Sequence, residues 1–62
     1  MTQKEITEKR NRVLAMLREL TEQVGELWED GYETESDMVN EVCERLSAES
    51  KRLRQIAKQV SN

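Results

Sequence analysis

The sequence predicts an all-α protein: a helix–loop–helix hairpin, with helices at about residues 3–30 and 35–61, that dimerises into an antiparallel four-helix bundle. Apolar residues recur at alternating intervals of four and three, proline is absent, and the composition is 37% charged and 35% hydrophobic. Such a chain of 62 residues forms one small domain, residues 1–62. Its few apolar side chains are enough for a very regular scaffold or for one that is shared with a second chain.

The first helix is predicted from seven evenly spaced positions, six of them apolar. They alternate between heptad positions a and d and are Ile6, Arg10, Val13, Leu17, Leu20, Val24 and Leu27. Thr2 and Glu5 have the spacing of a capping box at the helix start. Gly31 follows the last periodic residues, where a left-handed residue is expected, and Tyr32 then reaches back to Leu27.

The second helix shows the same period, again with six apolar residues of seven. These positions are Val39, Val42, Leu46, Glu49, Leu53, Ile56 and Val60. Thr34 and Asp37 have the spacing of a second capping box, and Glu35 and Asp37 favour the positive end of the helix dipole. A short loop between two long helices requires an antiparallel hairpin.

A second subunit is expected because one apolar stripe between two helices buries too little surface to hold them together. At the neighbouring e positions the first helix carries Leu14, Thr21 and Trp28, whereas the second carries mainly small residues. Large residues beside small ones leave room for another hairpin to dock on that side. The predicted dimer interface is Leu14, Leu17, Thr21, Trp28, Cys43, Leu46, Ser50 and Ala57.

The net charge of −3 hides a strong asymmetry. Residues 1–18 and 50–62, the open end of the hairpin, hold nine basic and two acidic residues, a formal charge of +7. Residues 19–49, the loop end, hold one basic and eleven acidic residues, a formal charge of −10. An antiparallel dimer places opposite charges side by side, and a parallel dimer places like charges together. The charge pattern therefore predicts an antiparallel homodimer.

The chain resembles the Rop protein family, whose members are short antiparallel dimers of helical hairpins that bind paired RNA loops. The resemblance covers the architecture of the whole chain, and in residues it covers the segment 42–46 (VCERL) followed by Leu53. It implies that RNA would meet the outward face of the first helix. Residues 32–41 (YETESDMVNE) look like the turn and second helix of ribbon-helix-helix antitoxins and repressors, which read DNA with an N-terminal strand. Good helix formers at residues 12–17 and a pI of about 4.9 argue against such a strand.

Catalysis is not expected, because the sequence has no histidine and no Gly-rich phosphate loop. Two helices are also not expected to form a pocket large enough to desolvate a pair of carboxylates. No catalytic residue, metal ligand or cofactor is assigned. Without a membrane span or signal peptide, and with the single thiol of Cys43, a cytoplasmic location is expected.

The predicted function is that of a small non-enzymatic regulatory or adaptor protein that binds another protein. The alternative is a nucleic-acid-binding regulator. The candidate contact residues for a partner or nucleic acid are Arg12, Arg18, Lys51, Arg52, Arg54 and Lys58. The other interpretation is that this basic end only pairs with the acidic end of the second subunit.

Three features carry two readings each. Trp28 is either a hot spot for an outside partner or a cover for the dimer contact. Cys43 is expected to be a small packing residue rather than a reactive thiol. Arg10 and Glu49 interrupt the apolar series, and they either reach solvent from the edge of the contact or pair across the dimer.

Overall fold

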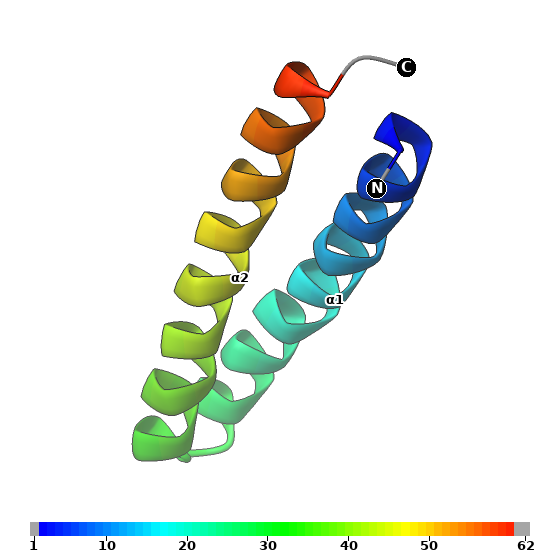
Figure 1. Cartoon of the computed structure of the whole chain (residues 1–62). Coiled ribbons are helices and arrows are strands. Elements are labelled where there is room, and N and C mark those ends of the chain that lie inside the picture. Colours follow the sequence, from blue (N-terminus) through cyan, green and yellow to red (C-terminus); the bar gives the residue numbers. More distant parts are fainter. Residues whose placement is uncertain (1, 61–62) are drawn as a thin grey trace.

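The structure is a computed structural model that describes residues 2–60, and it is an all-α hairpin of two helices. Helix α1 (Gln3–Glu29) and helix α2 (Glu33–Gln59) lie side by side and antiparallel, with the loop at one end and the start of α1 beside the end of α2 at the other (Figure 1). The Cα atoms form a rod that extends 48 Å by 14 Å by 12 Å. The predicted helical hairpin is confirmed.

Both predicted ends of α1 are confirmed. At its start the Glu5 N–H donates to Thr2 Oγ1 at 3.1 Å, and the Thr2 hydroxyl donates to Glu5 Oε1 at 3.3 Å. At its end Gly31 has a φ of +89°, the left-handed conformation that favours glycine. The N–H of Gly31 donates to Trp28 O at 3.1 Å and that of Tyr32 to Leu27 O at 2.8 Å. These two bonds form a Schellman motif, which turns the chain sharply out of α1.

The predicted start of α2 is wrong by two residues. The helix begins at Glu33, its N-cap is Tyr32 without a side-chain cap, and the Ser36 N–H donates to Tyr32 O at 2.9 Å. Thr34 therefore lies inside the first turn, and the second capping box predicted there is also wrong. The Schellman turn leads directly into the next helix, so no linker remains for a separate Thr cap. Helix α2 ends at Gln59, and the predicted end at residue 61 lies outside the described residues.

The apolar core is concentrated toward the open end of the hairpin. Ile6 is fully buried, and it forms a cluster with Val13 and Leu53, which are 8% and 2% exposed. Partly buried side chains surround this cluster, namely Leu46, Ile56, Ala57 and Val60. Burying three branched aliphatic side chains stabilises the open end by several kcal/mol, at about 1.5–3 kcal/mol each.

Small residues of α2 line its contact with α1 from the loop to beyond the middle of the rod. Ser36, Cys43 and Ser50 recur at intervals of seven, share one face of α2 and are all buried. Small side chains let the two backbones approach closely, and Ser36 Oγ donates to the main-chain oxygen of Val24 at 3.1 Å. At the open end, Gln3 Nε2 donates to Ala57 O at 3.2 Å, so the same face of α2 meets α1 along its whole length.

Candidate interaction surface

The eight residues predicted to form a dimer interface have very different environments in the hairpin. Cys43 and Ser50 are buried against α1 of their own chain, and Ala57 is half-buried beside the apolar cluster. Leu14, Leu17 and Leu46 are half-buried, and Thr21 and Trp28 are exposed. The small e positions of α2 thus serve the contact within the hairpin, and they are not open to a second chain.

The hairpin exposes more large apolar side chains than it buries among residues 2–60. Met38 is 64% exposed, Trp28 58%, Tyr32 54%, Met16 48% and Val42 46%. All five lie at the middle of the rod or in its loop half. Because soluble monomers rarely leave many such groups open, this distribution is typical of a surface that another molecule covers.

Met16 and Met38 were not identified from the sequence pattern. Both occupy heptad position g, next to position d, and so fall outside the a and d series that the pattern followed. The width of the apolar stripe is the feature of the sequence that could have identified these two methionines. A methionine at a g position widens it on the side opposite the e positions.

The two sides of the hairpin are distinguished by their heptad positions. The e side carries Thr21 and Trp28 of α1 together with the small residues of α2. The g side carries Lys9 and Met16 of α1, with Met38, Val42, Arg45, Glu49 and Arg52 from the g and d positions of α2. Because the helices are antiparallel, like positions of both helices lie on the same side of their contact.

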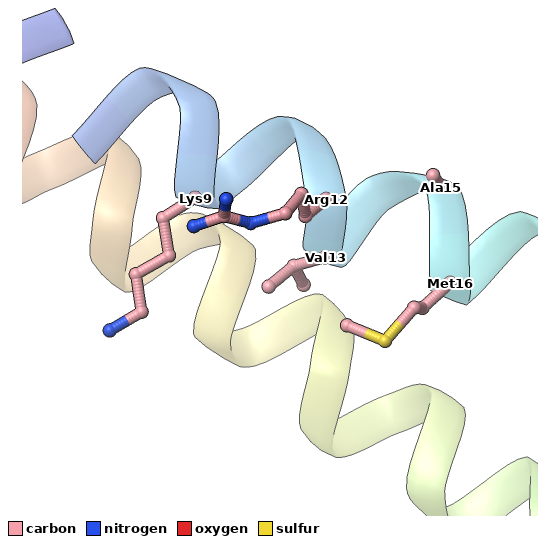
Figure 2. Close-up of a pocket in the computed structure, with 5 residues that line it drawn as sticks. All are labelled: Lys9, Arg12, Val13, Ala15 and Met16. Carbon is pink, nitrogen blue, oxygen red and sulfur yellow. The ribbon is translucent and has the colours of Figure 1, made fainter. Parts of the chain in front are cut away.

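A groove of about 440 Å³ lies on α1 at the middle of the g side. It is lined by Lys9, Arg12, Val13, Ala15 and Met16. In Figure 2 the side chains of Lys9, Val13 and Met16 extend from α1 toward the part of the view where α2 lies. The groove combines apolar side chains with two cations at its rim, a composition suited to an apolar group flanked by acidic residues.

All six predicted contact residues for nucleic acid or an acidic partner are exposed. They are Arg12, Arg18, Lys51, Arg52, Arg54 and Lys58. Within residues 2–60 the salt bridges are Arg45–Glu41 at 3.2 Å and Arg52–Glu49 at 2.5 Å. Of the six residues, only Arg52 forms one of these salt bridges. The open end of the rod therefore keeps a strongly positive charge.

Glu49 is held by a fork of two hydrogen bonds from Arg52. Arg52 Nε donates to Glu49 Oε2 at 3.0 Å and Arg52 Nη2 donates to Glu49 Oε1. These hydrogen bonds, with the positive charges of Arg52 and Lys9, lower the pKa of Glu49 below its usual value of 4.5. The same pair raises the pKa of Arg52.

Arg10, the other polar residue of the heptad series, is half-buried. Its Nε atom is buried and has no hydrogen-bond partner within the described part of the chain. In the hairpin the carboxylate of Glu49 forms its salt bridge with Arg52. Arg10 and Glu49 therefore do not pair within one chain. A buried donor without an acceptor lowers the stability of the fold. An acceptor supplied to Arg10 by a further molecule would remove this loss.

The described residues show no group of three or more His, Cys, Asp or Glu side chains placed to hold a metal ion. Over the same range, neither helix has the length and apolar character needed to cross a membrane. No protein-family model matches the chain, and no curated protein and no solved structure matches it either.

Proposed function

We propose that the chain is a small non-enzymatic regulatory or adaptor protein that binds another protein and works as a homodimeric four-helix bundle. The observation that carries this proposal is the set of exposed large apolar side chains, led by Met38 and Trp28. An isolated hairpin of this size gains little from its own core, and covering part of this set with a second hairpin supplies further apolar burial.

The charge distribution supports an antiparallel arrangement of the two copies. The structure is a rod 48 Å long, so the +7 open end and the −10 loop end lie far apart. In an antiparallel dimer each positive end lies beside a negative end, whereas a parallel dimer brings like ends together. Single exposed pairs contribute under about 1 kcal/mol each, but the sum over the whole rod has one sign.

The surface for an outside protein is proposed at the loop end. Trp28 and Tyr32 are the only aromatic residues, both are exposed, and both lie in the acidic half of the chain. Tryptophan and tyrosine are frequent hot spots of protein interfaces, and a cationic group can stack on their rings. The partner is therefore proposed to be a protein with a basic surface. A cytoplasmic location is part of the proposal, supported by the single unpaired thiol of Cys43.

Sedimentation equilibrium at micromolar concentration tests the dimer. The expected mass is twice the 7.3 kDa of one chain, and a 7.3 kDa species would overturn the proposal. Proteins retained by the immobilised chain then test the adaptor role. They are expected to be lost with Trp28→Ala and kept with Thr34→Ala, since Thr34 is an exposed residue of the same loop end.

The alternative function is nucleic-acid binding by the open end. The observation that favours it is the group of exposed basic residues that form no salt bridge within residues 2–60, such as Lys51 and Arg54. Binding of an RNA loop pair or a duplex would weaken steeply as salt rises. Reversing the charges at Arg52 and Arg54 would abolish it. A gel-shift assay at low salt that shows no complex with any duplex, loop pair or single strand excludes this function.

A further inference from the structure

We propose that a second copy of the chain docks on the g side of the hairpin, antiparallel, with Met16 lying opposite Met16 of the second copy. This inference rests on the homodimer of the proposed function and adds the face and the register of the contact. It differs from the interface predicted from the sequence, which lay on the e side.

The choice of face follows from the way in which α1 and α2 meet. Thr21 Oγ1 lies 3.9 Å from Cys43 Sγ, and both residues occupy position e. The buried Ser36 and Ser50 occupy the same position in α2. Each helix of a four-helix bundle has two neighbours, and its a and d residues point to the common centre. In α2 the e positions already face α1, and in α1 the buried residues are Ile6 and Val13 at d positions. The g positions of α2 are therefore open to the remaining neighbour.

The exposed side chains agree with this assignment. Met16 and Met38 occupy g positions, Val42 occupies a d position, and all three are about half exposed or more. On the e side, the corresponding positions of α2 are already buried within the hairpin. Docking on the g side therefore covers apolar surface that the hairpin leaves open, whereas docking on the e side meets mostly small residues that are already covered.

The register follows from symmetry. When two copies dock face to face and antiparallel, α1 lies on α1 of the second copy, and residues equally distant from the helix midpoint lie opposite each other. The midpoint of α1 (Gln3–Glu29) is residue 16, so Met16 lies on the two-fold axis. The groove lined by Val13 and Met16 is then filled by Met16 of the second copy.

Charges on both helices support this register. On α1, Arg12 comes within one residue of the level of Glu19 of the second copy, and on α2 Glu41 comes within one residue of the level of Arg52. A parallel docking would place each of these residues beside its own copy, with like charges at the same level. Antiparallel docking of a second copy is thus the occupant that both the shape and the charges of this face fit.

Disulfide cross-linking tests the face and the register together. In a chain with Cys43→Ala, the variant Met16→Cys is expected to oxidise to a covalent dimer under mild conditions. Lys9→Cys, on the same side but away from the midpoint, is expected to remain monomeric on its own. Mixed with Gln23→Cys, which lies equally far beyond the midpoint, it is expected to form a covalent heterodimer. Glu22→Cys, exposed on the outward face and outside the groove, serves as the control for random collision.

Each result of this experiment has a defined meaning. Cross-linking of Leu14→Cys in place of Met16→Cys would overturn the g-side assignment and favour the e side. Efficient cross-linking of Lys9→Cys with itself would overturn the antiparallel register. A chain that sediments as a monomer would overturn the proposed homodimer itself, so that failure is distinguished from an error in the face. Circular dichroism of each variant confirms that the helices are retained.

A charge variant provides a second, independent measurement. Met16→Lys places two ammonium groups together on the two-fold axis, and it is expected to raise the dimer dissociation constant about tenfold or more. Asn11→Lys, at an exposed position of α1 outside the groove, is expected to leave that constant unchanged. Equal effects of the two substitutions would contradict the proposed contact.

Discussion

The hydroxyl oxygen of Thr21 lies 3.9 Å from the thiol sulfur of Cys43, across the contact between α1 and α2. Thr21 also donates a hydrogen bond to the main-chain oxygen of Leu17 at 2.7 Å, which holds its side chain in a fixed position. The pair shows that Cys43, at an e position of α2, faces α1 inside the hairpin. This orientation hides the small residues of α2 and leaves Met16, Met38 and Val42 open.

The buried Cys43 side chain is predicted to be a size limit at this contact. Cys43→Leu inserts extra volume where α1 approaches closely, and it should lower the free energy of unfolding by about 1–3 kcal/mol. Ala48→Leu adds even more volume at an exposed position of the same helix and should change stability little. Urea denaturation at equal chain concentrations measures both, and equal stability of the two variants would contradict close packing at residue 43.

The two glycines are predicted to respond in opposite directions to alanine. Gly31→Ala forces a Cβ into the left-handed conformation at φ +89° and should cost about 1–2 kcal/mol. Gly25 lies inside α1, and a Cβ there meets no atom within 4 Å, so Gly25→Ala should stabilise by about 0.5–1 kcal/mol. Thermal unfolding measures the pair. A melting temperature that falls in both variants would show that residue 25 is constrained by something outside the hairpin.

The two threonines of the capping-box patterns are predicted to differ. Thr2→Ala removes the acceptor for the Glu5 N–H and should cost about 1 kcal/mol of stability. Thr34 lies inside the first turn of α2 and makes no cap, so Thr34→Ala should leave stability unchanged or raise it by about 0.5 kcal/mol. Chemical denaturation distinguishes them, and a loss of equal size at residue 34 would restore the second capping box.

The Glu49–Arg52 pair predicts a pH dependence. Because folding lowers the pKa of Glu49 below 4.5, its carboxylate stabilises the folded chain above that pH, and this contribution is lost as the pH falls through the lowered pKa. Glu49→Gln should therefore melt at a lower temperature than the unmodified chain at about pH 6 and at nearly the same temperature at about pH 3. Glu44→Gln, at an exposed position of the same helix, is the control. A difference that persists unchanged at the lower pH would contradict the role of the ion pair.

Local features of this protein follow from its sequence. The periodic positions from Ile6 to Leu27 predict one long helix, and the Thr2 cap and the Gly31 turn predict its ends within a residue. These features depend on residues within a few positions of each other along one helix, so a pattern read along the chain contains them. The start of α2 was missed because Thr34 offered a local cap, whereas the Schellman turn had already set the chain into the next helix.

The sequence by itself determined the two helices, their antiparallel pairing and the opposite charges of the two ends. The tertiary structure decided how each helix is rotated about its axis. A heptad pattern gives an apolar stripe wider than one contact, and it does not say which edge of the stripe faces the neighbouring helix. In the structure, α2 turns the edge that carries Ser36, Cys43 and Ser50 toward α1, because small side chains allow the two backbones to approach closely. That choice left Met16 and Val42 exposed and moved the candidate surface for a second copy to the opposite side.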